Sequence, residues 1–201
     1  MDRIAIATPS GRDGSVDQHI MEAQSVVMLL GVLDDHGVDA CIGGGWGVDA
    51  LLEQQTREHS DLDLWLPDAH LEPLFAGFAG CGVDRIFPWP GDRPWNFVLH
   101  DGAQLRVDLH LYESLPDGAL HYGSVTSGVV FPIHALRGRG VIAGISVRCE
   151  APEWAVRWRT GYPLRTVDRH DVSLLCERFG VDLPAGYVDR SPGSAAPPRP
   201  R

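Results

Sequence analysis

The sequence contains no lysine, and all 17 of its basic side chains are arginine. Without a lysine amine, the chain cannot form a Schiff base, and it lacks both the P-loop lysine and the strand lysine of protein kinases. Any anionic ligand, a triphosphate included, must therefore be neutralised by arginine, by a metal ion or by backbone N–H groups.

Cysteines and long apolar runs are also scarce. The four cysteines are dispersed without C-x₂-C spacing, and no apolar run reaches the roughly 18 residues that a membrane span requires. No apolar segment follows a basic start, as it would in a secretory signal peptide. We therefore expect a reduced, cytoplasmic protein with no membrane partner.

Positive charge is in deficit, because the formal net charge is -10. Affinity for DNA or RNA comes mainly from clustered cationic side chains at the phosphates, so we expect no nucleic-acid partner. A neutral or cationic partner suits an acidic protein better. With 201 residues and 44% hydrophobic content, the chain can bury one large core or a core with a small helical annex.

The ordered part of the chain is predicted to run over residues 17–190, because residues 1–16 and 191–201 lack periodicity and look disordered. Hydrophobic periodicity predicts helices over 17–35, 46–55, 68–79, 152–159 and 168–179, the first capped by Asp17 and stopped at Gly37. It predicts strands over 38–42, 61–66, 83–87, 95–100 and 105–112, and a hairpin over 140–148 that turns at Ala143-Gly144. This order predicts an α+β domain with a mixed sheet.

Three aspartates carry the strongest chemical signal. Asp61 and Asp63 lie two apart on a predicted strand, so both side chains leave one face, where they repel unless a cation such as Mg²⁺ lies between them. By the same period, Asp108 shares a strand face with Arg106 and His110. If the two strands are neighbours, three carboxylates converge. Such a set can bind the metal that bridges the phosphates of an NTP, and one member can accept a proton from an attacking hydroxyl.

An isolated Asp-x-Asp pair also occurs on solvated strand faces, so its surroundings matter. Here a glycine turn, Gly43-Gly44-Gly45-Trp46-Gly47, lies between a predicted strand and a predicted helix. Glycines let the backbone approach a ligand closely, and the helix N-terminus offers free N–H groups to an anion. We expect this turn to hold a triphosphate while a metal binds at the aspartates.

Further candidates flank these motifs. Arg57 would stabilise charge on the leaving pyrophosphate, His59 would orient Asp61 or touch a phosphate, and Asp49 is expected to have a structural role. Trp154 and Trp158, four apart on one helix face, are expected to pack in the core. Trp46 is a further candidate for contact with the nucleotide. Weaker candidates, for contact with the substrate, are Trp89, Trp95, His110, His170 and Asp171.

At these residues the chain resembles the nucleotidyltransferase superfamily that includes DNA polymerase β, and more closely its small antibiotic-inactivating members. Gly44-Gly45-Trp46-Gly47-Val48-Asp49, Arg57-Glu58-His59 and Asp61-Leu62-Asp63 resemble the signature of small lincosamide nucleotidyltransferases, and are similar to the aminoglycoside 2″-adenylyltransferases. Val107-Asp108-Leu109-His110 and the segment from Gly161-Tyr162 to Asp171 resemble the lincosamide enzymes. Val141-Ile142-Ala143-Gly144 with Val147-Arg148-Cys149 is instead similar to the aminoglycoside enzymes.

The resemblance, over residues 38–183, implies Asp61 and Asp63 as metal ligands, Asp108 as a ligand or general base, and Gly44-Gly45 as the phosphate turn. It implies the polymerase β-like fold, a mixed sheet with helices on one side and a helical C-terminal part. It also implies Mg²⁺, ATP or GTP as co-substrate, and a small-molecule acceptor with a hydroxyl group; a homodimer is left open.

Two other hypotheses stay open at this point. A relative of the same fold that modifies a protein, such as a toxin–antitoxin component, would share the motifs. A metal-dependent glycosyltransferase also uses Asp-x-Asp to bind a metal–nucleotide, but that reading gives no reason for the glycine–tryptophan turn or for Asp108.

Overall fold

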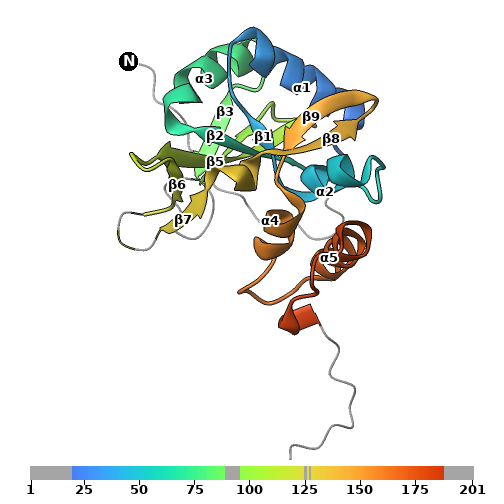
Figure 1. Ribbon diagram of the computed structural model, residues 1–201. Helices are drawn as coiled ribbons and strands as arrows, with labels where there is room; N and C mark the ends of the chain where they lie inside the picture. The colour runs from blue at the N-terminus through green and yellow to red at the C-terminus, as the bar shows by residue number, and fades with distance from the viewer. Residues whose placement is uncertain (1–19, 89–95, 125, 127, 188–201) are drawn as a thin grey trace, which may run out of the picture.

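The computed structural model describes residues 20–88, 96–124, 126 and 128–187 (Figure 1). The helices are α1 (Ala23–Asp35), α2 (Gly44–Leu52), α3 (Leu71–Gly80), α4 (Pro152–Arg157) and α5 (Thr166–Phe179), with short 3₁₀ helices at Asp68–His70, Ile133–Leu136 and Ala185–Tyr187. The strands are β1 (Cys41–Ile42), β2 (Leu62–Pro67), β3 (Arg85–Pro88), β4 (Asn96–His100), β5 (Arg106–Ser114), β6 (Ala119–Tyr122), β7 (Val129–Pro132), β8 (Gly138–Ile142) and β9 (Ile145–Cys149).

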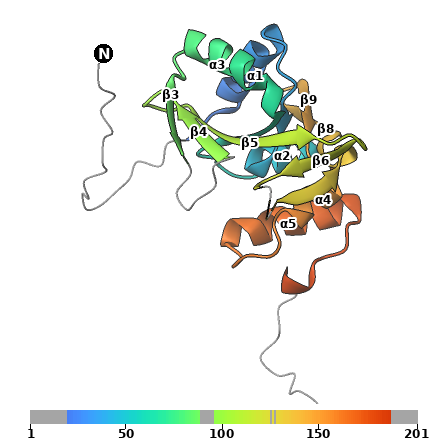
Figure 2. The same cartoon turned by 90° about the vertical axis from the view of Figure 1, so that its left-hand side faces the viewer.

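The described strands form one mixed sheet in the order β3-β4-β5-β2-β1-β9-β8, with β6 beside β5 and β7 beside β6. β2 runs parallel to β5 and β1 runs parallel to β9, whereas β1 and β2 are antiparallel. Figure 2 shows the β6 and β7 arm beside β5, on the side of the sheet where α4 and α5 lie. The predicted α+β class with a mixed sheet is thus observed.

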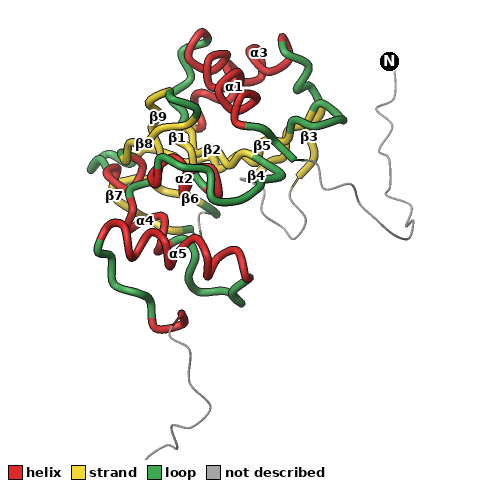
Figure 3. The backbone as a smooth tube through the Cα atoms, turned by 90° about the vertical axis from the view of Figure 1, so that its right-hand side faces the viewer, coloured by secondary structure: helices red, strands yellow, loops and turns green. Residues whose placement is uncertain are grey.

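Helices cover both faces of the sheet, not one as the resemblance implied. α1 and α3 pack together on one face, and α2 lies on the other, where it contacts β2 and β8 (Figures 1 and 3). α4 and α5 pack on each other and on α2, further from the sheet. The sequence of β2 explains why one face of the sheet is covered. Alternate side chains of a strand leave opposite faces, and Leu62, Leu64 and Leu66, which share one face, are all fully buried in the larger of the two hydrophobic clusters.

Most predicted elements exist, with shifted ends. The first helix begins at Ala23 after Glu22, and the expected cap Asp17 lies outside the described residues, as do the predicted tails. The second helix begins at Gly44 and ends at Leu52, because Glu53 has a left-handed backbone. The strand predicted over 38–42 is only two residues long, because the N–H groups of Val38 and Ala40 donate to the nearby carbonyls of Leu33 and Val38 and not to a neighbouring strand.

Two hairpins show what sequence patterns can and cannot reveal. The β8–β9 hairpin turns at Ala143 and Gly144 as predicted, and the positive φ of both residues suits a two-residue turn. The β6–β7 hairpin was not predicted. Its strands have four residues each, too few for an alternating pattern to stand out.

Candidate active site

Asp63 and Asp108 face each other across β2 and β5. The two strands are parallel neighbours, and their register pairs Asp63 directly with Asp108. Asp61 precedes β2 by one residue and lies on the same side as Asp63, away from the leucines of the core. The condition set by the sequence, that the two aspartate-bearing strands be neighbours, is therefore met.

These carboxylates line a cleft of about 600 Å³ beside the start of α2. Nine of the residues singled out from the sequence line it: Gly44, Gly45, Arg57, His59, Asp61, Asp63, Asp108, His110 and Asp171. Trp46 does not, since it is 1% exposed and lies in the core. His170 is exposed and lies outside the cleft lining. Trp89 and Trp95 lie outside the described residues.

Each carboxylate has a cationic or hydrogen-bonding partner. His110 Nε2 lies 3.1 Å from Asp63 Oδ1, and Arg106 donates from Nε and Nη2 to Asp108 over 3.0 and 3.3 Å. Arg106 Nε is also 3.8 Å from Asp61 Oδ2. With the side chains turned this way, no group of three His, Cys, Asp or Glu side chains within the described ranges is gathered around a single point.

The aspartates still perturb one another. Burial raises the pKa of Asp61 to about 6, and the charges of Asp63 and Asp108 act in the same direction. Burial also raises the pKa of Asp108, although Arg106 opposes it. Burial alone would raise the pKa of Asp63, but its hydrogen bond and charge interaction with His110 outweigh it and lower the pKa. Oxygen donors that repel each other in this way fit a hard cation such as Mg²⁺.

His110 is held by residues that the sequence did not single out. Its Nδ1 lies 3.0 Å from Asn96 Nδ2 and 2.9 Å from the Tyr122 hydroxyl, and that hydroxyl donates to Asn96 Oδ1. Its ring stacks on Trp65 with centroids 4.8 Å apart. Tyr122 comes from the unpredicted β6, so no local signal pointed to it.

The glycine turn makes room for side chains of the site. A Cβ on Gly44, whose φ is 56°, would overlap the carboxylate of Asp63, and a Cβ on Gly45 would overlap His59 Nδ1 and Arg57 Nη2. The first turn of α2 therefore lies directly against Asp63, Arg57 and His59. The bare backbone that the sequence assigned to phosphate binding is also what allows these three side chains to lie against the turn.

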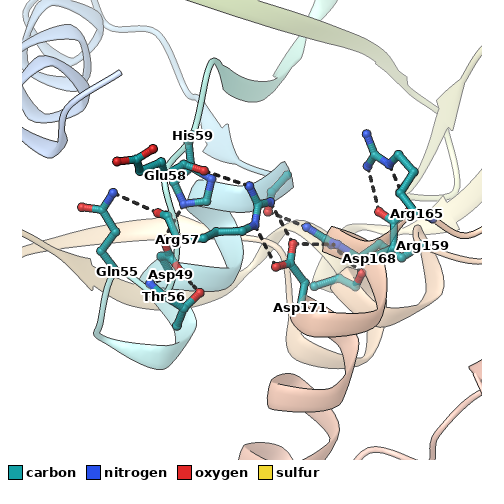
Figure 4. A network of polar contacts seen from close by, with 12 residues as sticks. Asp49, Gln55, Thr56, Arg57, Glu58, His59, Arg159, Arg165, Asp168 and Asp171 are labelled. Atoms are coloured by element: carbon teal, nitrogen blue, oxygen red, sulfur yellow. Dashed lines mark hydrogen bonds and ion pairs between the residues drawn. The ribbon is translucent and has the colours of Figure 1, made fainter. Parts of the chain in front are cut away.

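Buried carboxylates hold the loop after α2 (Figure 4). Asp49 accepts hydrogen bonds from the backbone and hydroxyl of Thr56 at 3.0 and 2.7 Å, and its Oδ2 lies 2.5 Å from His59 Nε2. This agrees with the structural role expected for Asp49. On the other side, Arg57 pairs with Asp171 of α5.

Comparison with known proteins shows the family of this chain. A model of the aminoglycoside-2''-adenylyltransferase family matches residues 25–175. The chain belongs to this family. It is 44% identical over 165 residues to a 2''-aminoglycoside nucleotidyltransferase of Escherichia coli, covering 77% of this chain and 85% of that one.

More distant similarity reaches the lincosamide enzymes. A lincosamide resistance protein of Staphylococcus haemolyticus is 22% identical over 147 residues, which cover 73% of this chain and 89% of that protein. The crystal structure of the lincosamide antibiotic adenylyltransferase LnuA with lincomycin superposes with a TM-score of 0.67 at 22% identity, over 78% of this chain and 97% of that one. The family match and the 44% identical relative make this chain a nucleotidyltransferase. The likeness to LnuA confirms the predicted fold class.

One wall of the cleft contains a tryptophan that was expected in the core from the sequence. Trp154 is buried in the smaller core as expected, but Trp158 lines the cleft and stacks on Trp65 with centroids 5.1 Å apart. Glu150 also lines the cleft, although it is buried, and it accepts a hydrogen bond from Trp65 Nε1 over 2.7 Å. Burial raises the pKa of Glu150 to about 7.

None of the described helices is long and apolar enough to cross a bilayer.

Proposed function

We propose that this chain transfers a nucleoside monophosphate from an NTP to a hydroxyl group of a small-molecule antibiotic, in a Mg²⁺-dependent reaction that releases pyrophosphate. The observation that carries this proposal is the register pairing of Asp63 with Asp108, beside Asp61 and directly against the N-terminus of α2. Carboxylates for a metal and N–H groups for phosphates thereby share one cleft.

The phosphates of the NTP bind at the start of α2. The unpaired N–H groups of the first helical turn and the guanidinium of Arg57 supply positive potential there, which a chain without lysine must obtain from such groups. Asp61 and Asp63 hold Mg²⁺, with His110 fixing the orientation of the Asp63 carboxylate. When bound, Mg²⁺ neutralises charge on the phosphate oxygens and orients the α-phosphate for attack.

Asp108 lies where it can act on the acceptor. It accepts the proton of the acceptor hydroxyl as that oxygen forms its bond to the α-phosphorus, and the bond from the α-phosphorus to the bridging oxygen of pyrophosphate breaks. Arg106 holds Asp108 through two hydrogen bonds and keeps it pointed along the strand face. The raised pKa of Asp108 favours proton uptake.

The acceptor proposed first is an aminoglycoside. The relative with 44% identity is named for the aminoglycoside 2″ position, and the net charge of -10 suits a cationic acceptor. A lincosamide is the second candidate, favoured by the likeness to LnuA and by the Trp65 and Trp158 wall, whose rings suit a less polar acceptor.

An acceptor screen tests the proposal. The purified chain is incubated with ATP or GTP labelled at the α-phosphate, in Mg²⁺ or in EDTA, with panels of aminoglycosides, lincosamides and proteins. Mass spectrometry should find an antibiotic heavier by one nucleoside monophosphate in the incubations with Mg²⁺ and not in those with EDTA. Label on protein only would favour a protein-modifying enzyme. In a parallel incubation with a nucleotide sugar in place of the NTP, transfer of sugar would favour a glycosyltransferase.

A further inference from the structure

Asp171 of α5 is a buried carboxylate shared by two arginines. It is 2% exposed, and Arg57 donates to it through a two-pronged pair, Nε to Oδ1 and Nη2 to Oδ2, each over 3.0 Å. Arg159, which follows α4, brings its Nε to 3.6 Å from Oδ2 of the same carboxylate. Figure 4 shows the three side chains converging from the loop after α2, from α5 and from the end of α4.

Both arginines also lie against the glycine turn. Arg159 Nη2 donates to the carbonyl oxygen of Gly44 over 2.6 Å, and Arg57 Nη2 lies against Gly45, where it would meet a Cβ. Both arginines line the cleft. A single carboxylate therefore fixes one cation against each of the two glycines at which α2 begins.

Arginine side chains need such a partner to be held in place. Ordering a free arginine costs side-chain entropy, and Arg57 comes from a loop with its side chain 25% exposed. Arg159 is held more firmly, because its side chain is 8% exposed and its Nη1 lies 4.0 Å from Oε2 of a second carboxylate, Glu150. Arg57 therefore depends most on Asp171.

We propose that Asp171 is a positioning residue for the triphosphate of the NTP. It acts through Arg57 and Arg159, which it holds at the N-terminus of α2, so that the C-terminal helix α5 sets the geometry of the phosphate subsite. This gives Asp171 a different role from the substrate contact expected from the sequence. The inference rests on the proposed function, because it assumes that phosphates bind at this turn.

The direction in which one substitution changes triphosphate affinity separates positioning from simple electrostatics. Asp171→Asn removes a negative charge beside an anion site. By electrostatics alone, the loss of its repulsion toward the phosphates would strengthen triphosphate binding. If Asp171 positions the arginines, the same change weakens binding, by about ten-fold or more for the loss of one charge-assisted hydrogen bond. Isothermal titration of inorganic triphosphate in Mg²⁺ measures the difference. Equal or tighter binding by Asp171→Asn would overturn the proposal.

Two further variants complete the test. Glu177→Gln removes one charge from the same helix at an exposed position and should bind triphosphate as the wild type does. If Asp171→Asn does not fold, Arg57→Gln removes the partly exposed partner and should weaken triphosphate binding by a similar factor. Unchanged binding by Arg57→Gln would also overturn the proposal.

The result of the triphosphate titration does not depend on the result of the acceptor screen. Inorganic triphosphate needs neither an acceptor nor turnover, so wild-type binding with a loss in Asp171→Asn supports this inference even if no antibiotic is modified. In an active enzyme, Asp171→Asn should raise KM for the NTP and leave KM for the acceptor unchanged, which a general loss of structure would not do. A rise in both KM values by the same factor would count against positioning.

Discussion

Asp63 and Asp108 are paired in register on two parallel strands, yet they bind different partners. Asp63 is hydrogen-bonded to His110, and Asp108 is paired with Arg106. The pKa of Asp63 is lowered and that of Asp108 is raised. Two adjacent carboxylates thus differ in their affinity for a proton, which suits a division of labour between a metal ligand and a base.

Asp63→Asn should abolish metal-dependent nucleotide binding. The change keeps the shape but removes the charge that a divalent ion requires, so ATP should bind no better in Mg²⁺ than in EDTA. Calorimetry under both conditions measures this. Asp68→Asn, an exposed change at the residue that follows the same strand, serves as control and should behave as wild type. Tight Mg²⁺-dependent binding by Asp63→Asn would exclude it as a ligand.

Asp108→Asn should leave most of the nucleotide binding and lower turnover. Loss of a positioned base costs on the order of 10² to 10⁴-fold in rate. Steady-state kinetics with an identified acceptor give the size of the loss. If raised Mg²⁺ partly rescues the rate, Asp108 is mainly a metal ligand. Full activity would remove Asp108 from the site.

Mg²⁺ should stabilise the protein more at higher pH. The folded pKa of Asp61 is raised to about 6 from 3.8, so its contribution to stability is present below about pH 4 and is lost as pH rises through 6. A bound cation offsets the repulsion of the ionised carboxylates. Thermal melts should therefore show a larger Mg²⁺-induced rise in Tm at about pH 8 than at about pH 5. An equal rise at both values would contradict this reading, and Asp61→Asn should reduce the difference.

Gly44→Ala should inactivate the enzyme, whereas Gly144→Ala should not. Both glycines have positive φ, 56° and 81°, so alanine costs about 1–2 kcal/mol of backbone strain at either position. A Cβ at Gly144 meets open space, but one at Gly44 would displace the Asp63 carboxylate. Denaturant unfolding measures the strain, and the transfer assay measures activity. An active Gly44→Ala variant would show that Asp63 need not lie against the turn.

The local parts of the site could be predicted from the sequence. The period of two placed Asp61 and Asp63 on one strand face, and the glycine run marked the start of a helix, because both depend on residues close together in the chain. The β8–β9 turn was found for the same reason. Arg159 and Glu150, which line the cleft from other elements, carried no such local signal, and the spacing of Trp158 from Trp154 pointed to the core instead of the cleft.

By itself the sequence determined the α+β class and indicated which residues are candidates for the chemistry, because carboxylate spacing, glycine turns and strand periodicity are properties of short segments. Only the tertiary structure decided that β5 lies beside β2, which brings Asp108 level with Asp63, and that Asp171 of α5 reaches Arg57 from 114 residues away. Strand order and buried ion pairs between distant segments depend on how the whole core packs, and that information is spread over the complete chain.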